Sequence, residues 1–200
     1  MSIYPTDSDM SMISSNRIIS DEIAELRLLR KKRHAECTKL IFLDLNGVLG
    51  HKIELDSPLA TLSDFCGLSY RFKPRSRVVD FVKHLQDIGF YVVIYTSRRR
   101  PNTTQIVETM GLKDVVDGVL CHDHCVGGKK SIAHALRYLR LEHRVHVEDC
   151  VIVDDTVEKI DDNPTECQIV AESYDPSDEK DTAFKLMDCI VIRTAHLFTL

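Results

Sequence analysis

The sequence predicts a three-layer α/β sandwich with a mostly parallel central sheet. Short apolar runs alternate along the chain with longer segments whose apolar residues recur at helical spacing. Such alternation predicts βαβ units, with right-handed crossovers and parallel strands. Two of the runs, Leu40–Leu43 and Cys150–Val153, are apolar throughout and are followed directly by aspartate. Continuous apolar runs are typical of strands that are buried on both faces of a parallel sheet.

Turn and breaker residues divide the chain into successive elements. Gly89 and Gly111 follow two helical patterns, and Pro101 suits the first turn of the second of them. The predicted elements are, in order, a strand over residues 40–43, a connector over 50–75, a helix over 78–88, a strand over 90–95, a helix over 101–110, a short strand over 115–120, a helix over 130–141, strands over 150–154 and 168–171, a helix near 178–188, and an apolar tail over 189–192.

The chain is predicted to hold one domain, residues 38–200, after an N-terminal extension. Residues 1–19 are rich in Ser, Met and Asp without periodicity, which favours disorder. Residues 20–36 are expected to form a helix that ends in the basic run 30–34. A basic end suits a helix C-terminus, and the alternative is a nuclear-localisation or docking patch.

Composition excludes several classes of protein. The net charge of −5 makes nucleic acid an improbable partner, and no apolar run is long enough to span a membrane. The N-terminus lacks the apolar core of a signal peptide. An odd number of cysteines, with Cys150, Cys167 and Cys189 in or beside apolar runs, favours reduced, buried thiols. We therefore expect a cytoplasmic or nuclear protein; no oligomeric state is indicated.

Acidic residues end two of the predicted strands. Asp44 follows the first apolar run, and Asp154 and Asp155 end another. Open α/β sheets bind ligands at the carboxyl ends of their strands. Three carboxylates suit a hard, oxygen-liganded ion such as Mg²⁺, and Asp44 and Asp155 must lie within about 8 Å of each other to share it. Adjacent acids would otherwise repel each other, which also favours a cation there.

Hydroxyl groups end the strand that lies between these two in the sequence, at Thr96 and Ser97. The resulting order of Asp, Thr-Ser, Lys and Asp-Asp resembles the haloacid dehalogenase superfamily of phosphohydrolases. Residues 70–75, with their Arg-Pro pattern, and Asn163-Pro164 resemble its carboxy-terminal-domain phosphatase branch, the NLI-interacting-factor-like group. The resemblance covers roughly residues 38–190 and implies a capless, Rossmann-like fold of the haloacid dehalogenase type.

The resemblance also implies roles for these residues. Asp44 matches the nucleophile, which forms an aspartyl phosphate. Mg²⁺ would be held by Asp44, by the main-chain carbonyl of Asn46 and by Asp155, with Asp154 close behind. Thr96 matches the hydroxyl that donates a hydrogen bond to the phosphoryl oxygens.

The lysine that neutralises the phosphoaspartate is expected near a helix start. Lys130 fits the family's pattern of lysine opening a helix, although Ser131 stands where the family has an acid. Lys129 is the second candidate.

Asn46 is where the sequence departs from the family, whose phosphatases carry aspartate there as general acid and base. Asparagine can donate a hydrogen bond but cannot exchange a proton at neutral pH. Loss of acid–base catalysis costs about 10²–10⁴ in rate. Three interpretations follow: a slow phosphatase, a non-catalytic relative resembling the branch's mitochondrial import-receptor member, or an engineered substitution.

The connectors predict the class of substrate. Residues 50–75 and 98–129 are too short for a cap domain with its own core. An open site suits a protein or nucleic-acid phosphate better than a small metabolite, and the expected substrate is a phosphoprotein, such as a Ser/Thr-phosphorylated tail. Ser97, Arg98 and Arg99 follow the phosphate-binding hydroxyl and are candidate substrate contacts; a solvated loop is the alternative.

The run Cys121–Cys125 raises the question of zinc, because it places cysteine and histidine within five residues. Structural zinc sites usually draw their ligand pairs from two separate segments, so we favour a loop without metal.

Overall fold

The computed structural model describes residues 30–59, 65–66 and 71–198. The chain divides into two compact units, residues 1–36 and 37–200. In the first unit, residues 30–36 are helical. The expected disorder of residues 1–19 and the start of the helix expected from residue 20 lie outside the described residues.

A five-stranded sheet forms the centre of the second unit. Its strand order is β6-β5-β1-β7-β8, and every neighbouring pair is parallel. The predicted α/β class is therefore confirmed, and the sheet is wholly rather than mostly parallel. The strands are β1 (Leu40–Leu43), β5 (Tyr91–Tyr95), β6 (Gly118–Leu120), β7 (Cys150–Asp154) and β8 (Gln168–Val170).

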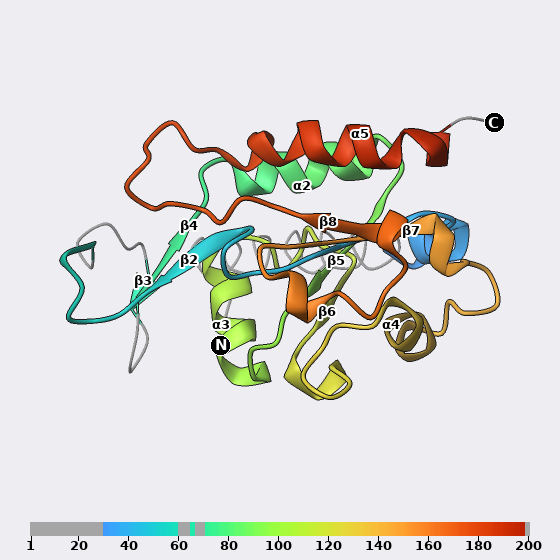
Figure 1. Ribbon diagram of the computed structural model, residues 1–200, viewed down its shortest axis with the longest axis horizontal. Helices are drawn as coiled ribbons and strands as arrows, with labels where there is room; N and C mark the ends of the chain where they lie inside the picture. The colour runs from blue at the N-terminus through green and yellow to red at the C-terminus, as the bar shows by residue number, and fades with distance from the viewer. Residues whose placement is uncertain (1–29, 60–64, 67–70, 199–200) are drawn as a thin grey trace, which may run out of the picture. The chain divides into compact units, whose positions relative to one another are not determined.

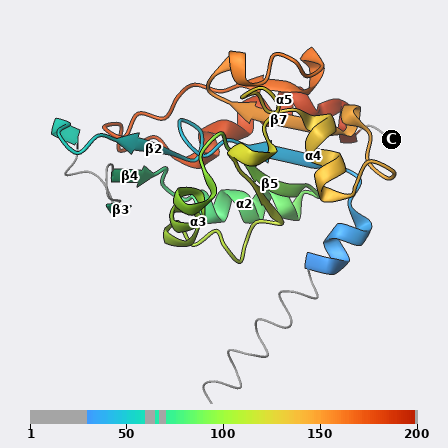
Figure 2. The ribbon, with the colours of Figure 1, turned by 90° about the horizontal axis from the view of Figure 1, so that it is seen from below.

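Helices cover both faces of this sheet, as Figure 1 shows: α2 and α5 lie together on one face, and α4 lies on the other. Figure 2, seen from below, places α4 in front of the strands. The α-helices are α2 (Val78–Asp87), α3 (Arg100–Thr109), α4 (Ile132–Leu139) and α5 (Leu186–Phe198). Short 3₁₀ turns complete the chain: η2 (His122–His124), η3 (Val147–Asp149), η4 (Val157–Lys159), η5 (Thr165–Cys167) and η6 (Ala183–Lys185).

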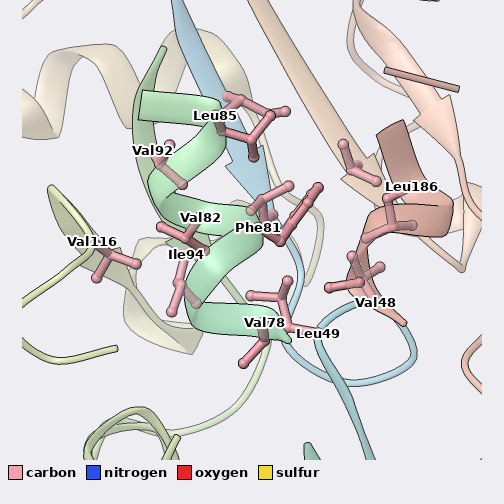
Figure 3. Close-up of a cluster of buried hydrophobic side chains, with 14 of the residues drawn as sticks. Val48, Leu49, Val78, Phe81, Val82, Leu85, Val92, Ile94, Val116 and Leu186 are labelled. Atoms are coloured by element: carbon pink, nitrogen blue, oxygen red, sulfur yellow. The ribbon is translucent and has the colours of Figure 1, made fainter. Parts of the chain in front are cut away.

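The core on the α2 side also anchors the turn that follows β1. Apolar side chains of α2 point toward β5 and toward Leu186 of α5 (Figure 3). Val48 and Leu49, from the turn after β1, are fully buried in the same cluster. Burying a Val or Leu side chain contributes roughly 1.5–3 kcal/mol. Hydrophobic packing therefore holds the backbone on which the site is built.

The connector after β1 contains a second, small sheet that the sequence analysis did not predict. Its antiparallel order is β2-β4-β3, with β2 at Gly50–Ile53, β3 at Phe65–Cys66 and β4 at Arg71–Pro74. It extends from one end of the second unit in both views (Figures 1 and 2). Phe72 is fully buried, but it belongs to the main core. The sheet has no hydrophobic cluster of its own among the described residues, which agrees with a capless fold.

The C-terminal helix differs from the prediction. A helix was expected near residues 178–188 with an apolar tail after it, but the 3₁₀ turn η6 leads into α5, which contains that tail. Leu186, Ile190 and Leu197 are buried at helical spacing. Cys189, expected to be buried, is exposed on this helix. Cys150 and Cys167 are buried free thiols, as expected.

None of the helices in the described ranges has both the length and the apolar character needed to cross a lipid bilayer.

Candidate active site

The carboxyl ends of three adjacent strands meet at one edge of the sheet. Asp44 follows the central strand β1, Thr96 follows β5, and Asp154 is the last residue of β7. The main-chain N–H of Asp44 donates to the carbonyl of Val153 on β7 at 2.9 Å. The hydrogen bonds of the sheet thus continue to Asp44 and fix the position of its backbone relative to β7. All three side chains are buried, with Asp44 only 6% exposed.

A cluster of carboxylates lies at this edge. Asp44, Asp154 and Asp155 each offer an oxygen, and these oxygens lie within 4.8 Å of one another. This is well inside the limit of about 8 Å beyond which Asp44 and Asp155 could not share an ion. The donor set, all carboxylate oxygen, is the one that Mg²⁺ prefers.

Lys130 bridges two of these carboxylates. Its ammonium group donates to Asp44 Oδ1 at 2.5 Å and to Asp154 Oδ2, and the residue is 1% exposed. Burial alone would lower the pKa of Lys130, but the two carboxylates outweigh this effect and raise it. Lys130 is therefore a buried cation at neutral pH.

Lys129, the other lysine candidate, lies outside the site. Its ammonium group contacts Asp161 at 2.7 Å and Asp162 at 2.8 Å, and both partners are exposed. The structure thus brings Lys130 to Asp44 and directs Lys129 away from it.

The charges of the cluster do not balance. Three carboxylates and one ammonium group leave two negative charges, the charge that one divalent cation neutralises. Burial and the neighbouring charge of Asp44 raise the pKa of Asp154, although Lys130 opposes the shift. The residues present fit Mg²⁺ in ligand type, in spacing and in charge.

The turn after β1 brings its backbone close to Asp155. Gly47 has φ = +88°, and a Cβ atom there would lie 1.9 Å from Asp155 Oδ2. Only glycine suits both the conformation and the space. The turn is closed by main-chain hydrogen bonds to the carbonyls of Leu45 and Gly50; within the described ranges, none of these bonds goes to the main-chain carbonyl of Asn46.

A loop over residues 171–182 supports the site from outside. Ser173 Oγ donates to Asp155 Oδ2 at 2.8 Å, and Tyr174 N–H donates to the Gly47 carbonyl at 2.7 Å. The loop is fixed by a buried bidentate ion pair between Arg75 and Asp181, with two contacts of 3.0 Å. The sequence analysis noted the segment containing Arg75 but missed the roles of Ser173 and Asp181, since neither residue belongs to a local motif.

Asn46 is partly buried, and its amide oxygen is held by two donors. The main-chain N–H of Lys52, on β2, donates to Oδ1 at 2.7 Å, and the guanidinium of Arg98 donates to it at 3.3 Å. Lys52 comes from the small sheet, which therefore contributes directly to the site.

These residues line a cleft of about 390 Å³. Of the three candidate substrate contacts, Ser97 and Arg98 line the cleft, whereas Arg99 is exposed and is not among its lining residues. Lys52 and Lys159 line the cleft and were missed, because the sequence places each in an otherwise unremarkable polar segment. The lining residues are Asp44, Asn46, Lys52, Thr96, Ser97, Arg98, Lys130, Asp154, Asp155, Thr156 and Lys159.

The Cys121–Cys125 segment does not gather metal ligands. His122 and Asp123 are exposed, and His124 Nδ1 accepts a hydrogen bond from the main-chain N–H of Cys121 at 2.8 Å. Within the described part of the chain, the aspartate cluster is the one group of side chains spaced to hold a metal ion.

Comparison with known proteins agrees with this geometry. The model of the family described as NLI interacting factor-like phosphatase matches residues 39–196. No curated protein matches the chain.

Two solved structures are similar over 89% of the chain. One is of Fcp1, described as an essential RNA polymerase II CTD phosphatase, with a TM-score of 0.51, 17% identity and 52% of that chain covered. The other is fission yeast RNA polymerase II CTD phosphatase Fcp1, a variant bound to beryllium fluoride, with a TM-score of 0.53, 15% identity and 54% covered. This chain thus spans about half their length, and identity at this level shows the fold alone.

Proposed function

The chain belongs to the NLI interacting factor-like phosphatase family. We therefore propose that it is a phosphatase in which Asp44 accepts the phosphoryl group and forms an aspartyl-phosphate intermediate. The observation that carries this proposal is the convergence of Asp44, Lys130 and the Asp154–Asp155 pair at one sheet edge. Lys130 holds the carboxylate of Asp44 in place and offsets its charge as an anionic phosphoryl group approaches.

In the first step, a carboxylate oxygen of Asp44 attacks phosphorus, and the bond to the leaving oxygen breaks. Thr96 lines the cleft and would donate its hydroxyl hydrogen to a phosphoryl oxygen. Its Oγ1 accepts from the N–H of Arg98 at 3.3 Å, a contact that leaves this hydrogen available. In the second step, a water oxygen attacks the phosphorus of the aspartyl phosphate and the bond between phosphorus and the Asp44 oxygen breaks. Phosphate leaves, Asp44 regains its carboxylate, and the proton of the water passes to solvent.

The metal that fits this site is Mg²⁺. Asp44, Asp155 and the main-chain carbonyl of Asn46 would hold it, with Asp154 behind them. The bound ion would supply positive charge that neutralises the phosphoryl oxygens. Its removal should therefore abolish turnover while leaving the fold in place.

Position 46 limits the rate in this proposal. The leaving oxygen needs a proton and the attacking water must lose one, and the amide of Asn46 can do neither. Turnover should be slow and should depend on a good leaving group. The alternative is a catalytically inactive phosphatase-like module that binds phosphorylated partners. Asn46 favours this alternative too, because its amide cannot transfer protons.

An open, basic cleft supports a phosphoprotein substrate. Lys52, Arg98 and Lys159 line it beside the acidic cluster. Such a wall can bind the phosphate and acidic groups of a Ser/Thr-phosphorylated tail. We place this activity in the cytoplasm or nucleus, because six of the cysteines, among them Cys150 and Cys167, are free thiols.

The proposal is tested by the hydrolysis of an aryl phosphate with Mg²⁺ and with a chelator. We expect slow turnover that requires Mg²⁺ and falls to the blank in Asp44→Asn, whose melting temperature serves as the control for folding. Turnover that survives in Asp44→Asn would exclude covalent catalysis at this residue. Phosphopeptide binding without any turnover would favour the binding module.

A further inference from the structure

Two donors converge on one atom of Asn46. The main-chain N–H of Lys52 lies 2.7 Å from Oδ1, and the guanidinium of Arg98 lies 3.3 Å from it. Both groups donate and neither can accept, so the atom between them must be the amide oxygen and not the amide nitrogen. These contacts fix which way the amide of Asn46 is turned.

The cleft therefore meets the other end of the amide. An amide oxygen has two lone pairs, and Lys52 and Arg98 supply two donors for them. Asn46 lines the cleft beside Asp44 and Thr96. What it can present there is its NH₂ group, which donates and does not accept.

The main-chain N–H and the main-chain carbonyl of Arg98 both form hydrogen bonds. Its N–H donates to Thr96 Oγ1 at 3.3 Å, and its carbonyl accepts from the N–H of His122 at 2.8 Å. The first contact ties it to the end of β5 and the second to η2. Its guanidinium thus reaches Asn46 from a backbone fixed to the central sheet.

We infer that Arg98 is a positioning residue that holds Asn46 with its NH₂ group toward the cleft, so that Asn46 is a fixed hydrogen-bond donor to an oxygen of the bound phosphoryl group. The phosphoryl role rests on the proposed function, whereas the hold of Arg98 on Asn46 does not. A donor at this place strengthens phosphate binding but cannot accept the proton of an attacking water. The site is then built to retain a phosphoryl group rather than to release it.

The first test reads the amide directly. The side-chain NH₂ signals of Asn46 are recorded by ¹⁵N-correlated NMR without ligand and assigned by their loss in Asn46→Asp. We expect Arg98→Ala and Arg98→Lys to shift them. Lys159→Gln is the matched control, because Lys159 lines the same cleft but has no contact with Asn46 among those the structure describes. Signals that respond no more to Arg98→Ala than to Lys159→Gln would overturn the inference.

The second test measures coupling through inorganic phosphate, titrated calorimetrically in the presence of Mg²⁺. If Arg98 acts through Asn46, Arg98→Lys should weaken phosphate binding about tenfold in the unmutated chain, the cost of losing a hydrogen bond from Asn46 to the charged phosphate. The loss should be clearly smaller in Asn46→Ala, because that variant has already lost this hydrogen bond. Equal losses in both backgrounds would contradict the positioning role. Absence of phosphate binding in the unmutated chain would overturn the phosphoryl role together with the proposed function, and the NMR result alone would then decide whether Arg98 orients the amide.

Discussion

Asp44 and Asn46 stand two residues apart in one turn, yet their surroundings differ in kind. Asp44 is buried against the ammonium of Lys130 and beside two further carboxylates. Asn46 is partly buried, uncharged, and held at its amide oxygen by Lys52 and Arg98. The charged corner of the cleft, at Asp44, Asp154 and Lys130, groups ionised side chains. The uncharged corner, at Asn46, holds an amide in one orientation. The comparison separates a charged carboxylate centre at Asp44 from an uncharged, fixed amide at Asn46, and the amide supplies no proton transfer.

The charged corner should dominate stability. Lys130→Ala leaves Asp44 and Asp154 buried without their cation, and losing one partner of a buried ion pair costs about 3–5 kcal/mol. Urea unfolding in the presence of a chelator measures the loss. Lys129→Ala is the matched control: its contacts with Asp161 and Asp162 are exposed and should contribute little to the free energy of unfolding. Equal effects at the two positions would remove the distinction between a buried and a surface lysine.

The uncharged corner should dominate the rate. Asn46→Asp keeps an oxygen for Lys52 and Arg98 and places a carboxylate oxygen toward the cleft. Aryl-phosphate turnover should rise about 10²-fold, the low end of general acid–base catalysis, with a larger gain for alkyl or seryl phosphates, whose leaving oxygens are more basic. If no substrate gains, the defect lies outside position 46 and the binding-module interpretation becomes the better one.

The hydrogen bond behind the proposed metal ligand Asp155 should have a smaller effect. Ser173→Ala removes the hydrogen bond that orients Asp155, and loss of such an outer contact typically weakens metal affinity at least about tenfold. Mg²⁺ titration by calorimetry checks this. Ser177→Ala is the control, because Ser177 lies on the same loop but bonds Asp175. Unchanged affinity in Ser173→Ala would show that Asp155 needs no such orientation.

The sheet and its acidic edge could be predicted from sequence because they are local patterns. An uninterrupted apolar run followed by aspartate marks a buried strand end, and parallel strands bring such ends together. The choice of Lys130 over Lys129 could be made only from a family pattern. The two lysines are identical neighbours in the sequence, and they differ in where the fold directs their side chains.

The features that the sequence analysis missed or misplaced depend on tertiary contacts. Lys52 reaches the cleft through β2, a short strand of mixed polarity whose pairing with β4 is not evident from its sequence. The C-terminal helix was misplaced because the β-branched run within 189–192 does not favour a helix on its own. Burial of Leu186, Ile190 and Leu197 against the core overrides that weak preference.

The most direct test of the account is whether Asp44 retains the phosphoryl group. The unmutated chain is mixed with Mg²⁺ and an aryl phosphate that has a very good leaving group, quenched rapidly in acid, and analysed by peptide mass spectrometry. We expect a burst of aryl alcohol equal to the amount of protein, and a peptide containing Asp44 that carries one phosphoryl group. The same species should be scarce in Asn46→Asp, where the second step regains its base. Turnover without a burst and without modified Asp44 would contradict the account.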